Sequence, residues 1–217
     1  MIIHDLELEN SVLNQFVLEL RDVDLQRDTL RFRKNIERIG EILGYELSKV
    51  LDYQSKTAQT PLGSKTILVP ENDIVLCAIL RAGLPLHQGL LNYFDKAENA
   101  FISAYRQHEN DQDDFEVIVK YLASPSLQGK TLILIDPMLA TGKTLENTFK
   151  AMKAHGVPKH IHIVSVIGSN QGVAYAQTIF PENTHLWIAA IDEKLNSKSY
   201  IIPGLGDAGD LAYGVKL

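Results

Sequence analysis

The sequence predicts an α/β protein built around an open, mainly parallel β-sheet with helices on both faces. Short apolar runs of strand length alternate along the chain with segments whose apolar residues recur at helical spacing. The apolar runs are continuous, which is typical of parallel strands that are buried on both sides. With 217 residues, of which 45% are hydrophobic, the chain is long enough for one sizeable core. We therefore predict a single domain over residues 1–217.

The first predicted element is an amphipathic helix between residues 24 and 51, packed against something larger. Charged residues occupy one side of this segment, and apolar residues recur at helical spacing on the other. The apolar set is Phe32, Ile36, Ile39, Leu43, Leu47 and Val50. A turn is expected next, around Pro61 and Gly63.

Strands and helices are predicted to alternate beyond this turn. The strands are 74–80, 100–106, 131–136, 161–168 and 185–191, and the helices are 84–94, one that begins at Thr144 and one that begins at Gln171. The polar run 106–116 interrupts the pattern with many charges and no Gly or Pro. Its composition is equally typical of a mobile flap and of a plain solvated connection.

The charge balance bears on possible partners. The chain has 21 basic and 27 acidic residues, a formal net charge of -6, which does not favour RNA or DNA. Small phosphorylated ligands need only local positive charge and remain compatible with it.

Cysteine use and hydropathy limit other classes of protein. The single cysteine, Cys77, excludes an internal disulfide and a multi-cysteine zinc site, and its apolar surroundings predict a buried core thiol. His160 and His162 alternate along a predicted strand, so packing is favoured over metal binding. No apolar run approaches the length of a membrane span, and the N-terminus carries acids where a signal peptide has bases. We expect a cytoplasmic protein without a membrane partner.

Charged residues follow the ends of predicted strands. Arg81, Arg106 and Asp136 each stand at such a position. Ligands of open parallel sheets bind where the carboxyl ends of the strands meet the loops and helix N-termini. These residues are therefore candidates for one common site.

The stretch after Asp136 predicts an anion cradle. Small residues precede a helix whose N-terminus offers free N–H groups and a partial positive charge. A phosphate monoester is the natural ligand. A nucleotide-binding P-loop is the alternative, but it needs a glycine where this chain has Pro137.

The strand, its acid and the Ala-Thr-Gly-Lys-Thr segment resemble the phosphoribosyl diphosphate (PRPP) signature of type I phosphoribosyltransferases. Residues 200–210, YIIPGLGDAGD, and residues 136–142, DPMLATG, further resemble the uracil phosphoribosyltransferases of that family. The resemblance covers residues 74–214 well. It implies the type I phosphoribosyltransferase fold, with an N-terminal helical segment and a small hood.

The resemblance implies which residues bind PRPP. Asp136 would face the ribose hydroxyls, and Arg81 and Arg106 would contact the diphosphate, for which a guanidinium fork is well suited. The loop and helix start would hold the 5-phosphate; these residues are Pro137, Met138, Leu139, Ala140, Thr141, Gly142, Lys143 and Thr144. Lys143 replaces a glycine that is common in uracil-specific members, and its side chain is expected in solvent rather than on the phosphate. The family's cis peptide bond is expected between Arg81 and Ala82.

The resemblance also implies the uracil site. Ile201 and the backbone of Gly206, Asp207 and Ala208 would read the base, and Asp207 would also face PRPP. Uracil is a flat ring with carbonyl acceptors and an N–H donor, so it needs backbone groups without bulky side chains between them. The small residues of this segment provide that access.

The implied reaction is transfer of phosphoribose from PRPP to N1 of uracil, giving UMP and diphosphate. The catalytic residues would be Arg81, Arg106, Asp136 and Asp207, with Mg²⁺ held mainly through PRPP and water and no protein metal site. We expect a homodimer or higher homo-oligomer. The alternative is a regulatory or catalytically weak relative that binds nucleotide or RNA. The departures from the family pattern after Arg106, at Gln107 and His108, are the reason to consider a weak relative, and those at Ser199 and Leu211 could alter turnover or regulation.

Overall fold

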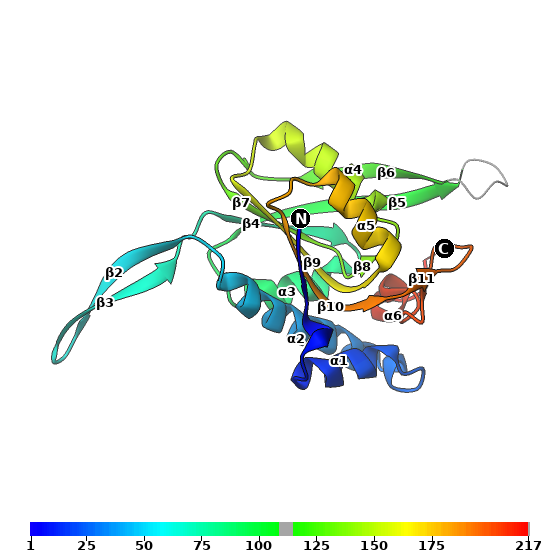
Figure 1. The fold of residues 1–217 in the computed structure, drawn as a ribbon, viewed down its shortest axis with the longest axis horizontal. Coiled ribbons are helices and arrows are strands. Elements are labelled where there is room, and N and C mark those ends of the chain that lie inside the picture. Colours follow the sequence, from blue (N-terminus) through cyan, green and yellow to red (C-terminus); the bar gives the residue numbers. More distant parts are fainter. Residues whose placement is uncertain (109–114, 217) are drawn as a thin grey trace.

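The fold is built on one large β-sheet with helices on both faces (Figure 1). The computed structural model describes residues 1–108 and 115–216, and it describes their side chains except for 104–108 and 115–120. The strand order is β1-β10-β9-β7-β4-β5-β6, and β8 pairs with β9. The strands are β1 (Ile2–Asp5), β4 (Ile74–Leu80), β5 (Glu98–His108), β6 (Phe115–Ala123), β7 (Thr131–Ile135), β8 (Met138–Leu139), β9 (His160–Ser169) and β10 (His185–Asp192).

The described pairings confirm a mainly parallel sheet. Neighbouring strands run parallel throughout, except that β5 and β6 are antiparallel. Parallel neighbours place their carboxyl ends at one edge of the sheet. The carboxyl ends of β4, β5 and β7 therefore lie at the same edge, as the sequence predicts.

The helices divide between the two faces of the sheet. They are α1 (Val12–Arg21), α2 (Thr29–Ser48), α3 (Gly83–Leu91), α4 (Lys143–Met152), α5 (Asn170–Ile179) and α6 (Ala208–Tyr213). Alternate residues of β4 enter different cores: Leu76 packs with α2 and α3, and Cys77 packs with α4 and α5. Burial on both sides explains the continuous apolar strands.

The long amphipathic helix is confirmed as α2, with different ends. Asp28 caps it, because its side chain accepts a hydrogen bond from the Arg31 N–H. The predicted start at residue 24 is wrong, because a separate 3-10 helix, η2 (Leu25–Arg27), precedes the cap. Val50 was expected on the apolar face, but it follows the helix and is 44% exposed.

Several elements were not predicted. Strand β1 and helix α1 precede α2, and a hairpin, β2 (Tyr53–Thr60) and β3 (Gly63–Pro70), projects from the body (Figure 1). The turn around Pro61 and Gly63 is confirmed as the tip of this hairpin. The hairpin strands are largely exposed on both sides, so they lack the apolar periodicity that marks a buried strand.

Two predictions about buried side chains are confirmed. Cys77 is fully buried, and burial raises the pKa of its thiol to about 12. His162 is buried in β9 and accepts a hydrogen bond from the Trp187 indole at 3.2 Å, which is a packing role. In the described parts of the chain, no helix has the length and apolar character needed to cross a membrane.

The remaining elements lie near the C-terminus or are short. Strands β11 (Lys194–Leu195) and β12 (Ile201–Ile202) form a small antiparallel pair, which α6 follows. Two further 3-10 helices are η1 (Leu6–Leu8) and η3 (Lys153–His155). The β11–β12 pair and α6 lie beyond the end of β10, at the opposite end of the molecule from the β2–β3 hairpin (Figure 1).

Candidate functional site

Residues 136–144, which we call the cradle loop, connect β7 to α4. Asp136 follows β7 directly and is only 9% exposed. Its carboxylate accepts a hydrogen bond from the Met138 N–H at 3.2 Å. Its backbone carbonyl accepts one from the Ser165 hydroxyl at 2.7 Å. The acid is therefore held on both its side chain and its main chain.

The cradle loop ends at a helix start that suits an anion. Gly142 precedes α4 with a φ of +79°, a left-handed conformation that favours glycine. Because Gly142 has no side chain, it cannot cap the N–H groups of the first helical turn as a serine or aspartate would. The Lys143 N–H donates to the Thr141 hydroxyl oxygen at 3.4 Å, and the N-terminal N–H groups and dipole of α4 provide the chemistry of a phosphate site.

Strand β9 and helix α5 support the cradle loop from behind. The Ser169 hydroxyl donates to the Ala140 carbonyl at 2.6 Å and accepts from the Gly172 N–H at 2.9 Å, so it also caps α5. A Cβ atom at Gly172 would lie 2.2 Å from the Ala140 carbonyl oxygen. The close approach of α5 to the loop therefore requires glycine at position 172.

Arg81 lies between the sheet and the C-terminal segment. Its guanidinium donates to Asp210 Oδ1 at 3.0 Å and to the Gly214 carbonyl at 3.2 Å, and its side chain is 40% exposed. Nearby, a Cβ atom at Gly83 would lie 3.0 Å from the Ile135 carbonyl, so the loop after β4 lies against the end of β7. The structure thus brings Arg81 to the same edge as Asp136.

The expected cis bond between Arg81 and Ala82 is wrong. The cis peptide bond joins Leu80 to Arg81, one position earlier, at the point where β4 ends.

Arg106 lies on β5, where it is in register with Val117 of β6. The strand does not end there as predicted but continues to His108. The arginine's side chain lies outside the described part of the structure, as does the centre of the predicted flap, residues 109–114. The described residues of the predicted flap, 106–108 and 115–116, belong to the antiparallel strands β5 and β6 rather than to a loop.

Residues 201–208, which we call the C-terminal loop, connect β12 to α6. Ile201 and Ala208, at its two ends, are 4% and 2% exposed. Between them Gly204 and Gly206 have φ angles of +62° and +92°, and the bond from Ile202 to Pro203 is cis. The two glycines therefore allow turns that a residue with a side chain would rarely adopt.

Asp207 caps α6 and is the charged centre of this region. Its Oδ1 accepts from the Asp210 N–H at 3.0 Å, and its Oδ2 lies 3.0 Å from the Lys216 ammonium. Burial raises the pKa of the Asp207 carboxyl, but the hydrogen bonds from Asp210 and Lys216 outweigh it. The net effect is a pKa below the ordinary value, so this group is a carboxylate at neutral pH.

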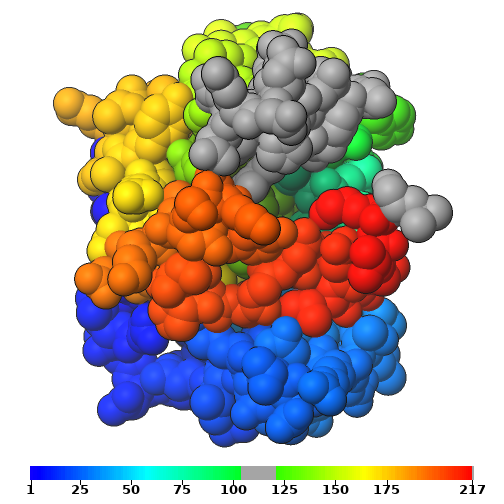
Figure 2. Space-filling view, turned by 90° about the vertical axis from the view of Figure 1, so that its right-hand side faces the viewer, coloured from blue at the N-terminus to red at the C-terminus, as the bar shows by residue number. Residues whose placement is uncertain are grey.

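The cradle loop and the C-terminal loop both contribute to the same hydrophobic core. Ala140 packs in the same buried cluster as Ile201, Leu205 and Ala208. In Figure 2 the C-terminal segment, orange to red, forms a band above the blue N-terminal helices. Within the cradle loop, Pro137, Leu139 and Gly142 are buried, whereas Thr141, Lys143 and Thr144 are partly exposed.

Several charged residues of this region were missed by the sequence analysis. The residues that contact the C-terminal loop or its neighbours are Arg21, Asp192, Asp210 and Lys216. Asp192 is the last residue of β10, and Asp136 directly follows β7. The signal that selected Asp136, a charged residue at the end of a strand, could therefore also have selected Asp192. Arg21 and Lys216 carry no comparable signal in the sequence.

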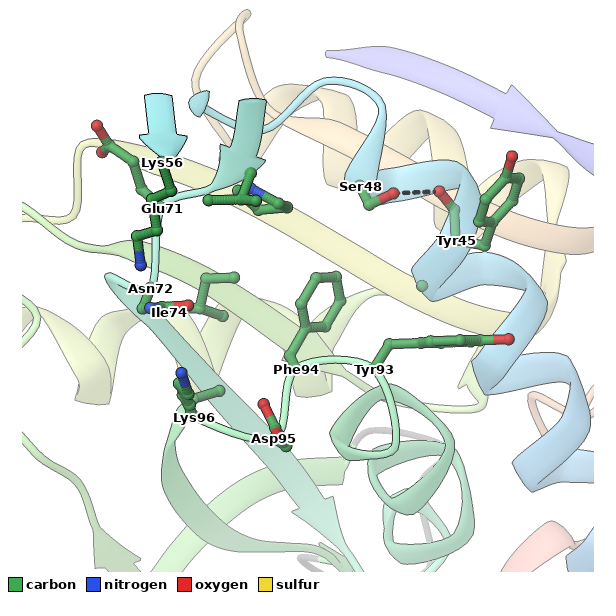
Figure 3. A pocket seen from close by; sticks show the side chains of 14 residues that line it. Tyr45, Ser48, Lys56, Glu71, Asn72, Ile74, Tyr93, Phe94, Asp95 and Lys96 are labelled. Carbon is green, nitrogen blue, oxygen red and sulfur yellow. Dashed lines mark hydrogen bonds between the residues drawn. The ribbon is translucent and has the colours of Figure 1, made fainter. Parts of the chain in front are cut away.

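A separate cavity of about 460 Å³ lies away from these residues (Figure 3). It is found where the β2–β3 hairpin joins the body, and Tyr45, Tyr93 and Phe94 contribute to its wall. None of the predicted site residues lines it. Among the residues that the structure describes, no three His, Cys, Asp or Glu side chains gather in a way that could hold a metal ion.

Comparisons with known proteins found relatives that match nearly the whole chain. The family model described as uracil phosphoribosyltransferase matches residues 8–215. The uracil phosphoribosyltransferase of Porphyromonas gingivalis is 55% identical, covering 100% of this chain and 99% of the relative. That of Thermococcus gammatolerans is 36% identical, covering 96% and 92%. The solved structure of the AQ2163 protein from Aquifex aeolicus aligns over 100% of both chains with a TM-score of 0.88 and 32% identity.

Proposed function

The chain belongs to the uracil phosphoribosyltransferase family, and from this premise we propose how its residues carry out the reaction. The protein is a pentosyltransferase that transfers phosphoribose from PRPP to N1 of uracil, giving UMP and diphosphate in pyrimidine salvage. The observation that carries our proposal is the contact of Arg81, which follows β4 at the carboxyl edge of the sheet, with Asp210 of α6, because it brings the C-terminal segment to that edge.

We assign the 5-phosphate and ribose of PRPP to the cradle loop. Residues 137–144 present the N-terminus of α4, and the first-turn N–H groups suit phosphate oxygens. Asp136 would bind the ribose hydroxyls, because its carboxylate is anchored at the end of β7 and accepts hydrogen bonds. The hydrogen bonds from Ser165 and Ser169 support this assignment, since they hold the loop in shape before any ligand arrives.

We assign the diphosphate to Arg81 and Arg106. Arg81 is paired with the Asp210 carboxylate, and diphosphate oxygens offer its guanidinium an equivalent anionic partner. Binding of PRPP would therefore exchange one anion for another without leaving the arginine unpaired. Arg106 would approach from β5, the strand next to β4.

Mg²⁺ completes the proposed PRPP site. This ion commonly keeps several waters and binds through one or two carboxylates together with substrate phosphates. Asp136 and Asp207 offer such carboxylates, which fits an ion held mainly through PRPP and water. When bound, it would neutralise charge on the leaving diphosphate.

We assign uracil to the C-terminal loop. Ile201 and the backbone of Gly206, Asp207 and Ala208 would read the carbonyl and N–H groups of the base. The left-handed Gly206 and the small Ala208 leave the main chain accessible for such contacts. The Asp207 carboxylate would face both the base and PRPP.

The proposed mechanism rests on positioning and electrostatics rather than on a covalent intermediate. The bond from the ribose C1′ to diphosphate breaks, the diphosphate leaves with the electron pair, and uracil N1 bonds to C1′ and loses its proton. Arg81 and Arg106 would stabilise charge on the leaving group, and the two loops would hold the reactants together. Exclusion of water protects the ribosyl cation-like state.

A turnover assay with several bases tests the assignment of the base site. Uracil should be converted to UMP in the presence of PRPP and Mg²⁺, whereas cytosine, hypoxanthine and guanine should not react. Backbone groups fixed to read uracil would face mismatched donors and acceptors on those bases. Comparable turnover of cytosine or a purine would refute the assignment.

Substitution of Arg106 tests the diphosphate site. Arg106→Ala should raise the KM for PRPP and lower kcat while the protein stays folded, because a charge-assisted contact to the leaving group is lost. Arg27→Ala, at an exposed position on η2, is the matched control. Unchanged kinetics for Arg106→Ala would remove this residue from the site.

We further propose that the protein is a homodimer or higher homo-oligomer. The β2–β3 hairpin exposes apolar side chains, with Leu62, Ile67 and Leu68 at 100%, 50% and 65% exposure. An isolated two-stranded hairpin is only marginally stable in water, so a second copy is the natural cover for it. Light scattering should report an oligomer, and Ile67→Ser with Leu68→Ser should shift it toward the monomer. A monomeric wild type would refute the proposal.

A further inference from the structure

An ion pair at the end of helix α1 lies directly behind the C-terminal loop. Arg21 and Asp192 form two parallel hydrogen bonds, from NH1 to Oδ2 at 2.8 Å and from NH2 to Oδ1 at 2.9 Å. Their side chains are 20% and 8% exposed. A two-pronged guanidinium–carboxylate pair has a fixed relative geometry, and low exposure protects it from screening. The pair therefore provides a rigid connection between α1 and the end of β10.

Both members of this pair also bind the main chain of Gly204. Arg21 donates to the Gly204 carbonyl at 3.0 Å, and the Gly204 N–H donates to Asp192 Oδ2 at 3.1 Å. The two backbone polar groups of one loop residue are thus held by one ion pair. Gly204 is buried, and a Cβ atom there would lie 2.2 Å from the Ile201 carbonyl oxygen. The loop therefore passes too close to itself at this point for any other residue.

Gly204 stands between the two groups that are proposed to read uracil. Ile201 precedes it, where β12 pairs with β11, and Gly206, Asp207 and Ala208 follow it at the start of α6. A displacement of Gly204 would move the two groups relative to each other. Uracil presents its polar groups at fixed spacing on a rigid ring, so its affinity depends on that relative position.

Helix α1, which carries Arg21, is itself held in place by contacts with α2 and the core. Glu19, two residues before Arg21, accepts hydrogen bonds from Arg31 at 2.7 Å and from the buried Asn35 at 2.7 Å, and both donors belong to α2. Leu13 and Leu20 of α1 are 1% and 0% exposed in the core. The position of Arg21 is therefore set by the packing of α1 and α2 beneath the sheet.

We propose that Arg21 and Asp192 are positioning residues for uracil, which act by clamping Gly204 and touch neither substrate. The proposal rests on the assignment of uracil to the C-terminal loop. It gives the N-terminal helix a specific part in binding the base, and it assigns no part to this ion pair in binding PRPP. The clamp therefore predicts a kinetic effect that is confined to one of the two substrates.

Steady-state kinetics of Arg21→Gln tests the clamp. The KM for uracil should rise about tenfold to hundredfold, the loss expected from a charge-assisted hydrogen bond, while the KM for PRPP changes less than about twofold. Arg21→Lys should recover part of the loss, because the ammonium keeps the charge but only one of the two prongs. Arg27→Gln, an arginine on the neighbouring η2 that is 78% exposed, is the matched control and should behave as wild type.

The wild type is measured first, so that a failure of the uracil assignment can be distinguished from a failure of the clamp. A wild type that does not convert uracil overturns the assignment of uracil to the C-terminal loop, and the clamp with it. An active wild type with an Arg21→Gln variant that raises both KM values equally, or neither, overturns the clamp alone.

Asp192→Asn provides a second variant if Arg21→Gln does not fold. It keeps an oxygen for the Gly204 N–H but weakens the ion pair, and it should raise the KM for uracil selectively. Hydrogen exchange supplies a readout independent of activity: amides of residues 201–208 should exchange faster in either variant, whereas those of the cradle loop should not. Equal acceleration in both loops would show a general loss of structure and refute the clamp.

Discussion

The cradle loop and the C-terminal loop are held in place by different kinds of interaction. The surroundings of the cradle loop fix it with neutral groups, the hydroxyls of Ser165 and Ser169 and the close approach of Gly172, and within the loop the Met138 N–H donates to the Asp136 carboxylate. The C-terminal loop depends on charged side chains, above all Arg21 and Asp192, which bind the main chain of Gly204. Neutral buried contacts respond to changes in shape, whereas ion pairs respond to pH and to loss of a partner. The two halves of one site should therefore fail under different perturbations.

The largest effect is expected from Gly172→Ala, which attacks the cradle loop through its shape. The added Cβ would lie 2.2 Å from the Ala140 carbonyl and 2.7 Å from the Leu139 carbonyl, and neither backbone can yield without moving the loop. Overpacking of this kind should cost about 3 kcal/mol of unfolding free energy. Urea denaturation measures this cost, and kinetics should show a raised KM for PRPP with the KM for uracil nearly unchanged.

Ala174→Ser is the control for this substitution, because Ala174 is exposed on the same helix. It should leave both stability and kinetics close to wild type. If Gly172→Ala raised the KM for uracil as much as that for PRPP, the two loops would not be held independently of each other.

The next-largest effect is a loss of stability at acidic pH. It should affect the C-terminal loop through α1, because this helix carries both Glu19 and Arg21. A hydrogen bond from Arg31, with further ones from Gln15 and Asn35, lowers the pKa of Glu19 from 4.5 to about 2. The folded state then binds fewer protons than the unfolded state. The stabilisation is thus complete above pH 4.5 and is lost as the pH falls toward 2. Thermal unfolding from pH 6 downward should show this loss in the wild type.

Glu19→Gln should flatten that pH dependence, because the titrating group is gone, at the cost of lower stability near neutral pH. Glu182→Gln, at an exposed position, should keep the wild-type slope. An unchanged slope in Glu19→Gln would mean that this carboxylate does not control acid stability.

The smallest effect is expected from Lys216→Gln, which compares an exposed ion pair of the C-terminal region with the largely buried Arg21–Asp192 pair. Lys216 pairs with Asp207 and Asp210, but its side chain is 64% exposed. Exposed ion pairs contribute less than about 1 kcal/mol, so thermal stability and the KM for uracil should change little. A loss as large as that of Arg21→Gln would show that exposure does not separate the two ion pairs.

The sequence alone determined the sheet, the long helix and the cradle loop. Each rests on a short-range signal: buried strands are continuous apolar runs, α2 repeats its apolar residues at helical spacing, and the cradle follows its strand within one stretch of chain. Such signals act between neighbours in sequence, where backbone geometry and local burial decide the outcome. The Gly-rich C-terminal segment was likewise visible as a contiguous motif.

Only the tertiary structure decided how the C-terminal loop is held. Arg21 and Asp192 are 171 residues apart in the sequence, and Arg81 and Asp210 are 129 apart. Such pairs form when packing brings distant elements together, and an arginine or aspartate by itself does not reveal its partner. The exposed β2–β3 hairpin was missed for a related reason, since strands without a buried face carry no apolar alternation. Local patterns therefore predicted the residues of the proposed site, and long-range packing supplied the contacts that hold its proposed base-binding half in place.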